Sequence, residues 1–256
     1  MIPQPFVKGA GERVFFGPYE YPDGADIIFD FGNPTCTSAF NSSNIVYNVG
    51  SANITGSLIP YNNPGPFYPT LSTDAGGIMI TKAVGGGVGS NYLQWQWKST
   101  EQQSNVFIFA MNGNQLNPWS SYLPEAAGAS SIQTNLYGTT ANSGSATVNV
   151  IFYNSSNSPN DIFTSTGLDT KTSNGRNGYN MIGAAADNST YHALVLNQTP
   201  ATIDTTSISR STSGTQTTNF GVSSNMRIMA FLQYPKILTA KQWRQIYKVF
   251  APRFFT

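Results

Sequence analysis

Charged side chains are scarce in this sequence. Asp, Glu, Lys and Arg make up 10% of the 256 residues, and the net charge is +1, whereas an average soluble protein has about 25% charged residues. Such a chain lacks the basic footprint of a nucleic-acid-binding protein. A weakly charged surface also repels other copies only weakly. We therefore expect no nucleic-acid partner, and we expect a homo-oligomer.

Cysteine is nearly absent as well. Cys36 is the only one in the chain, which excludes an intrachain disulfide, and we expect its thiol to be buried and idle. Residues 1–5 lack the basic stretch and apolar run of a secretory signal. No apolar run approaches the roughly 20 residues that cross a bilayer. We therefore expect neither export nor a membrane partner.

Side chains for acid–base catalysis are also few. His192 is the only histidine and lies within a predicted strand, so we expect a structural or surface role for it. Retaining glycoside hydrolysis needs two carboxyl groups about 5–5.5 Å apart. Asp26 and Asp30 share one face of a predicted strand, but at roughly 13 Å they are too far apart. None of the four glutamates lies in a paired pattern: Glu12, Glu20, Glu101 and Glu125. We therefore expect no enzymatic activity.

Proline and glycine divide the chain into an arm and one domain. Pro3, Pro5, Pro18 and Pro22 exclude a regular helix from residues 1–24. We predict that this segment is an extended N-terminal arm, which either lies on its own domain or docks onto a partner subunit. Residues 25–256 show no internal repeat and no clear linker, so we treat them as one domain.

Short alternating runs fill most of that domain. A period of two is the mark of a strand, and about ten such runs separated by turn residues are typical of a β sandwich or barrel. The predicted strands are 25–31, 45–49, 77–81, 92–97, 105–111, 131–137, 146–153, 179–184, 191–197 and 226–233. We expect loops at 62–66, 85–87, 154–160 and 209–218, the last being a mobile surface loop rich in Ser and Thr.

One helix is predicted, at 240–250. Thr239 and Gln242 have the spacing of a capping box, and Leu238 with Trp243 forms a hydrophobic staple. Apolar side chains recur with helical spacing and form one stripe, which we expect to dock on the sandwich. The members of the stripe are Trp243, Ile246, Tyr247 and Phe250. Pro252 is expected to stop the helix.

Two segments carry a resemblance to a known family. The first is Asp26-Ile27-Ile28-Phe29-Asp30-Phe31-Gly32-Asn33-Pro34, followed later by Gly56-Ser57-Leu58. The second is the strand 226–232 with the capped helix that ends near Tyr247. Together they resemble the laminin G-like domains of the concanavalin A-like superfamily, in the form found in tailed-phage structural proteins. The resemblance implies an all-β, concanavalin A-like jelly-roll sandwich of two antiparallel sheets with one C-terminal amphipathic helix.

Domains of this kind include lectins and glycan-binding modules, so aromatic side chains on loops are candidate sugar contacts. Trp119 and Tyr122, predicted in a loop, are our glycan-binding candidates. Trp95 and Trp97 alternate on one strand, which favours core packing or a subunit interface. Some members of the superfamily bind calcium through Asp and Asn oxygens, although no cofactor is expected here. The calcium candidates by chemistry alone are Asp161, Asp169, Asp187 and Asn188.

The resemblance implies a non-enzymatic virion structural protein, either a capsid decoration, a head-fibre or a tail component, with host-surface glycan adhesion as an added role. Its expected partners are other virion proteins, contacted through the arm 1–24, and a cell-surface glycan. The expected location is the virion, after synthesis in the host cytoplasm. The alternative is a free carbohydrate-binding, lectin-like module. The fold alone does not decide between them.

Overall fold

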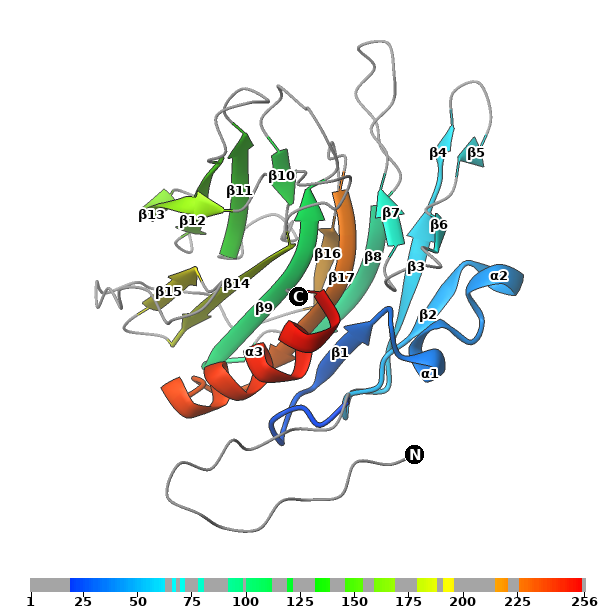
Figure 1. Ribbon diagram of the computed structural model, residues 1–256, viewed down its shortest axis with the longest axis horizontal. Coiled ribbons are helices and arrows are strands. Elements are labelled where there is room, and N and C mark those ends of the chain that lie inside the picture. Colours follow the sequence, from blue (N-terminus) through cyan, green and yellow to red (C-terminus); the bar gives the residue numbers. More distant parts are fainter. Residues whose placement is uncertain are drawn as a thin grey trace.

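The computed structural model describes most of the β-strand framework and the C-terminal helix. The described residues are 19–62, 66–67, 70–71, 78–80, 92–98, 100–111, 119–121, 132–138, 146–153, 159–168, 179–187, 191–195, 215–220 and 226–254. Within them, every strand pairing is antiparallel (Figure 1). The prediction of a mainly β chain with a C-terminal helix is therefore confirmed.

A seven-stranded sheet, called the central sheet here, organises the fold. Its strands in spatial order are β15 (Tyr191–Val195), β14 (Tyr179–Ala186), β9 (Gln103–Met111), β17 (Met226–Tyr234), β7 (Ile78–Ile80) and β6 (Thr70–Leu71), and β1 (Ile27–Asp30) also pairs with β17. The whole of β17 pairs with β9 on one edge, whereas β7 and β1 pair with successive halves of the other edge. The last strand of the chain is thus enclosed between strands from its first half.

A second sheet, the facing sheet, packs on one face of the central sheet. Its strands are β16 (Thr215–Phe220), β8 (Tyr92–Lys98), β3 (Thr55–Ile59) and β2 (Ile45–Tyr47). The ring of Trp95 on β8 lies 5.3 Å from that of Phe29 on β1 and 4.6 Å from that of Phe231 on β17, measured between ring centroids. All three side chains are buried. These aromatic contacts form the interior of the sandwich.

The remaining described elements are smaller. A four-stranded sheet, green in Figure 1, comprises β10 (Trp119–Ser121), β11 (Ile132–Gly138), β12 (Ala146–Tyr153) and β13 (Pro159–Leu168), and β4 (Tyr61–Asn62) pairs with β5 (Pro66–Phe67). Two single-turn helices, α1 (Pro34–Thr37) and α2 (Phe40–Ser43), follow β1. The predicted two-sheet arrangement is therefore too simple, because the described strands belong to four sheets.

Helix α3 (Ala240–Phe254) covers the other face of the central sheet (Figure 1). Its N-terminus has the predicted capping box: the main-chain nitrogen of Thr239 donates to Gln242 Oε1 at 2.9 Å, and that of Gln242 donates to Thr239 Oγ1 at 3.3 Å. Both residues of the predicted staple are buried. The apolar stripe packs with side chains of β1, β9, β14 and β17 in one core cluster. The result is three layers, helix on sheet on sheet.

The helix is longer than predicted. Pro252 was expected to stop it, yet α3 continues to Phe254 with Pro252 inside its last turn. A proline so close to the end removes only a single helical hydrogen bond. The next residue, Arg253, makes two side-chain hydrogen bonds to Asp30, which hold the last turn in place. No helix in the described ranges is long and apolar enough to cross a membrane.

Seven of the described strands lie where no strand was predicted, namely β3, β4, β5, β6, β10, β13 and β16, and three of them show why. β16 occupies the end of the predicted Ser- and Thr-rich loop, where threonine suits an outer strand of the facing sheet. β13 begins in the predicted loop at 154–160 and runs for ten residues. The alternation of apolar and polar residues in β3 is not evident from its sequence, because Gly56 takes a buried position that usually holds an apolar side chain.

The close contact between β14 and α3 yields a stability prediction. A Cβ atom on Gly183 would overlap the six-membered ring of Trp243. We expect Gly183→Ala to lower the free energy of unfolding by about 1–3 kcal/mol, as overpacking of a tight core does. Urea denaturation followed by fluorescence measures the change.

Two matched variants define the mechanism of that loss. Lys241→Ala, at an exposed position of the same helix, should leave the unfolding midpoint nearly unchanged. Trp243→Phe should reduce the effect of Gly183→Ala, because a smaller ring leaves room for the added methyl group. Equal losses in both backgrounds would show that this contact is not the cause.

Candidate functional site

The carboxylate of Asp30, the last residue of β1, is fully buried and accepts four hydrogen bonds. Arg253 donates two of them, from Nη1 to Oδ2 at 2.6 Å and from Nη2 to Oδ1 at 2.7 Å. The Tyr21 hydroxyl donates to Oδ2 at 2.5 Å, and the Gly32 main-chain nitrogen donates to Oδ1 at 2.9 Å. A buried charge is costly unless it is paired and hydrogen-bonded in this way. We call these four residues the Asp30 clamp.

The guanidinium group of Arg253 contacts two aromatic rings in addition to its hydrogen bonds to Asp30. The guanidinium carbon lies 5.5 Å from the ring centroid of Tyr19 and 5.0 Å from that of Phe250. Burial lowers the pKa of Arg253, but the hydrogen bonds and charge of Asp30 outweigh it and leave the pKa above its usual value. The Tyr19 hydroxyl donates to the Gly32 carbonyl oxygen at 2.8 Å. The clamp and the contacts of Tyr19 therefore fasten residues 19–21 to the end of β1 and to the last turn of α3.

The motif at residues 30–34 is explained by the clamp and by the helix that follows. A Cβ atom on Gly32 would overlap Arg253 Nη2, so no larger residue fits there without displacing the arginine. Asn33 caps α1, because its Oδ1 accepts from the Thr35 main-chain nitrogen at 3.0 Å. Pro34 occupies the first helical position, where the absence of an N–H group costs nothing.

Two titratable groups beside Asp30 are kept neutral. Burial raises the pKa of Tyr21, and the charge of Asp30 and its hydrogen bond to the tyrosine raise it further, so the hydroxyl stays a proton donor. Burial also raises the pKa of the Cys36 thiol to about 12. Cys36 is a buried free cysteine, as predicted. Because the thiolate is the reactive form, this thiol is poorly suited to nucleophilic or redox chemistry.

Asn48 fixes the loop that follows β2 against β1. Its Oδ1 accepts from the main-chain nitrogens of Ile28 and Gly50 at 2.6 and 2.9 Å. Its Nδ2 donates to the carbonyl oxygens of Asp26 and Ala52 at 2.8 and 2.6 Å. One side chain thus satisfies four main-chain groups and makes the loop a rigid wall.

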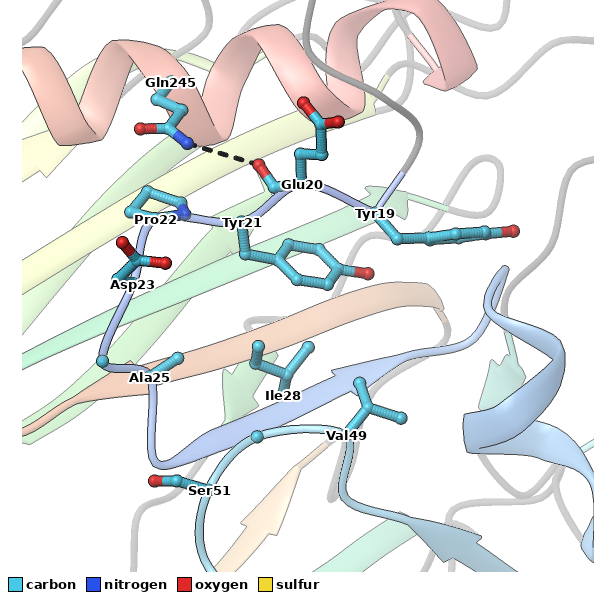
Figure 2. A pocket seen from close by; sticks show the side chains of 12 residues that line it. Tyr19, Glu20, Tyr21, Pro22, Asp23, Ala25, Ile28, Val49, Ser51 and Gln245 are labelled. Carbon is cyan, nitrogen blue, oxygen red and sulfur yellow. Dashed lines mark hydrogen bonds between the residues drawn. The ribbon is translucent and has the colours of Figure 1, made fainter. Parts of the chain in front are cut away.

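An open cleft of about 490 Å³ lies between this wall, the segment 19–25 and α3 (Figure 2). The residues that line it are Tyr19, Glu20, Tyr21, Pro22, Asp23, Gly24, Ala25, Ile28, Val49, Gly50, Ser51 and Gln245. Its volume lies within the range of about 300–1,000 Å³ that is usual for small-molecule sites. The sequence analysis did not identify it, because its walls come from four separate segments.

The cleft has an apolar floor and a polar rim. Figure 2 shows the side chains of Ile28 and Val49 pointing into the space beneath the ring of Tyr21. On the rim, the carboxylates of Glu20 and Asp23 are exposed, and neither has a hydrogen-bond or ion-pair partner among the described residues. No Lys, Arg or His side chain lines the cleft.

The segment 19–25 that carries this rim is held by hydrogen bonds to its main chain. Gln245 Nε2, on α3, donates to the Glu20 carbonyl oxygen at 3.3 Å, the bond drawn in Figure 2. Lys236 Nζ donates to the Asp23 carbonyl oxygen at 2.6 Å. Both contacts use the main chain and leave the two carboxylates exposed. These bonds and the Asp30 clamp show that residues 19–24 of the predicted arm lie on the domain, whereas residues 1–18 lie outside the described residues, so docking of the arm onto a partner stays a prediction.

A second polar surface is the outer face of the facing sheet. Val46, Leu58, Leu93 and Trp95 turn inward and are buried. The alternate positions turn outward, and the exposed ones are Tyr47, Thr55, Ser57 and Gln96. None of these four carries a charge, and Tyr47 is 43% exposed. This face offers hydroxyl and amide groups beside an accessible ring.

The predicted glycan-binding residues are only partly described. Trp119 was expected in a loop, but its main chain begins β10 and pairs with Leu136, at an outer strand of the four-stranded sheet. A strand forms there because β11 offers a paired edge. Tyr122 lies outside the described residues. The described residues therefore do not test whether the two side chains lie together, and their role stays a prediction.

The other predicted positions resolve in different ways. Trp95 lies in the sandwich interior, which confirms core packing, and Trp97 is half-buried. His192 lies in β15, where its main chain pairs with Ala185. Asp26 accepts a hydrogen bond from the Ser51 hydroxyl at 2.9 Å, and Glu101 is exposed.

The calcium candidates are scattered. Asp161 lies in β13 and Asp187 directly after β14, whereas Asp169 and Asn188 lie outside the described residues. In the part of the chain that the structure describes, no three His, Cys, Asp or Glu side chains are grouped closely enough to hold a metal ion. Asp161 and Asp187 are therefore not part of such a group.

Comparison with known proteins by sequence returns nothing: no family model matches, and no curated protein matches. Similarity of fold is extensive. The chain superposes on a structure of botulinum neurotoxin type C, whose cell entry depends on interaction with two ganglioside molecules, with TM-score 0.55 and 12% identity. It also superposes on the receptor-binding domain of botulinum neurotoxin type G, with TM-score 0.56 and 8% identity.

The extent of these matches differs. The two toxin matches cover 88% and 89% of this chain but 51% of each toxin chain, so this chain spans about half their length. A third structure, domain 4 of AbnA, is matched over 98% of its length and 88% of this chain, with TM-score 0.51 and 10% identity. It belongs to an extracellular arabinanase of Geobacillus stearothermophilus and was solved in complex with arabinotriose. These similarities establish a shared β-sandwich fold.

The Asp30 clamp yields a second stability prediction. In Asp30→Asn the guanidinium of Arg253, whose side chain is 17% exposed, loses its counter-charge. We expect the free energy of unfolding to fall by about 3–5 kcal/mol, the usual result of removing one partner from a buried ion pair. The matched control is Glu101→Gln, which neutralises an exposed carboxylate and should change stability by less than about 0.5 kcal/mol. A loss below about 1 kcal/mol for Asp30→Asn in guanidinium denaturation would contradict this assignment.

Proposed function

We propose that this chain is a carbohydrate-binding domain of the concanavalin A-like jelly-roll type, without hydrolytic activity. We further propose that it works as a structural or adhesion component of a virus particle, in the head or the tail. The alternative is a free lectin-like module. In both versions the domain binds a glycan. They differ in whether the domain is part of a virus particle or a free protein.

The observation that carries the proposal is the fold. The three-layer sandwich resembles, over nearly its full length, a domain that was solved with arabinotriose, and it resembles a toxin that interacts with gangliosides. A fold does not by itself define a ligand, so the surface must suit one. The open cleft and the exposed outward residues of the facing sheet both carry hydroxyl, amide and aromatic groups. Such groups suit the hydroxyls and C–H faces of sugars.

Lack of hydrolysis is proposed from the roles of the carboxylates. A glycosidase needs one carboxyl group that protonates the leaving group and a second that attacks or activates water. Asp30 is occupied by the four hydrogen bonds of the clamp, and Asp26 accepts from Ser51. Structural roles for these two side chains leave them poorly suited to proton transfer.

The placement on a virus particle is proposed from the sequence motifs and the low charge. The motif at residues 30–34 and the capped C-terminal helix resemble phage laminin G-like domains. A nearly uncharged surface favours packing against neighbouring copies. The three structures compared above do not come from viruses, so this part of the proposal rests on the sequence.

Glycan binding is tested with the whole purified chain on an array of oligosaccharides. We expect saturable binding to at least one class and no release of reducing sugar from it. If the predicted aromatic pair forms the site, Trp119→Ala should weaken binding about tenfold, because stacking against a sugar face is lost. Tyr47→Ala, on the outer face of the facing sheet, is the matched control. A larger loss of binding in Tyr47→Ala than in Trp119→Ala would place the site on that face. Absence of all binding would refute the function.

The virion placement is tested by quantitative peptide mass spectrometry of particles separated on a density gradient. We expect the protein to band with the particles. Hundreds of copies per particle would indicate a head component, and a few copies a tail or fibre component. Recovery only at the top of the gradient would leave the free lectin-like module as the correct version.

A further inference from the structure

We propose that the cleft beside the Asp30 clamp binds one uncharged saccharide unit, an inference that rests on the carbohydrate-binding function above. The cleft belongs neither to the predicted aromatic pair nor to the outer face of the facing sheet. It combines a rigid frame, an apolar floor and exposed acceptors with no cation among its lining residues. The following three properties account for the affinity of the cleft, for its contact with the sugar ring and for its preference in ligand charge.

The frame is rigid before any ligand binds. Asn48 holds one wall through four hydrogen bonds to the main chain. The opposite wall, residues 19–25, is anchored by the Asp30 clamp and by Gln245. A pre-formed site avoids the free-energy cost of ordering loops on binding. This matters for sugars, whose hydroxyls give up water for each contact that they make.

The floor suits the less polar face of a sugar ring. Ala25 and Ile28 are buried and Val49 is half-buried, and all three line the cleft. The ring of Tyr21 packs 6.0 Å from that of Phe250 and closes one side. An apolar, aromatic-edged floor of this kind takes the C–H groups of a pyranose or furanose ring, while the hydroxyls at its perimeter reach the rim.

The charged groups on the rim determine which ligand charge is favoured. The Asp23 carboxylate is exposed and can accept two sugar hydroxyls, and a hydrogen bond to a carboxylate is about twice as strong as a neutral one. The Glu20 side chain points away from the floor, toward α3, so it contributes charge to the rim rather than a contact (Figure 2). Gln245 keeps its Oε1 as a further acceptor, because only its Nε2 is used in the contact with Glu20. The two carboxylates are opposed by one nearby ammonium, Lys236 Nζ, which donates to the Asp23 carbonyl oxygen at 2.6 Å. The remaining negative charge disfavours sialylated, sulfated and phosphorylated sugars by like-charge repulsion. The cleft therefore selects neutral sugars against anionic ones.

A metal ion is a poorer fit to the same carboxylates. Calcium takes six to eight oxygen ligands at about 2.3–2.6 Å. The grouping of acidic side chains that such a site needs does not occur in the described part of the chain. The exposed position of the Asp23 carboxylate instead leaves it free to meet hydroxyls of a ligand that lies across the floor.

The test is an array of neutral, sialylated and sulfated oligosaccharides, followed by calorimetric titration of the whole chain with the strongest neutral binder. We expect neutral sugars to bind and their sialylated counterparts to bind at least about tenfold more weakly. Asp23→Asn should weaken neutral binding about tenfold, since a charged acceptor is replaced by a neutral one. Ser51→Arg, at the exposed rim, should abolish it by filling the cleft. Glu101→Gln removes a carboxylate elsewhere and should bind as the unaltered chain does.

The outcomes separate this inference from the function on which it rests. If the chain binds glycans but Asp23→Asn and Ser51→Arg bind normally, the site is elsewhere and the cleft is not the binding site. If only anionic sugars bind, the charge argument is wrong. If no glycan binds at all, the carbohydrate-binding function itself fails. Unchanged thermal unfolding of both variants excludes misfolding as the reason for any loss.

Discussion

The buried ion pair between Asp30 and Arg253 is the constraint on which the rest of the structure depends. It joins the first strand of the central sheet to the last turn of the C-terminal helix, and through Tyr19 and Tyr21 it fastens the preceding segment to both. A charge pair with so little solvent is stable only in one geometry. That geometry determines where α3 ends, which residue follows Phe31, and where the cleft opens between the segment and the sheet.

The layers above and below the central sheet explain why its strands are so uniformly buried. All four residues of β1 are buried because Phe29 meets the facing sheet and Ile28 meets the helix side. A sheet covered on both faces loses the simple alternation of apolar and polar residues. The facing sheet is covered on one face only, and it keeps that alternation. Its outer face and the cleft are accordingly surfaces, among the described residues, where polar groups are available for recognition.

Local patterns were sufficient to predict the local elements. The capping box of α3 and the alternation in β8 and β12 involve residues a few positions apart, and each formed near its expected place. The clamp could not be predicted, because it joins residues 223 positions apart and nothing near Arg253 marks it as a partner of Asp30. The cleft was missed for the same reason. Gly56 was seen only as part of a motif, although a Cβ atom there would crowd Val46 and Leu93 in the sandwich interior.

The enclosure of β17 has a consequence for the order in which the molecule is made. During synthesis β1 leaves the ribosome early, but its partner strand and the arginine that neutralises Asp30 follow some two hundred residues later. Until then β1 has an open edge and an uncompensated carboxylate. Contacts of such long sequence separation form slowly, because a large loop must close first. The domain is therefore completed only when β17 and α3 have been made, and a nascent chain that stops before β17 exposes the aggregation-prone edge of β1 to its neighbours.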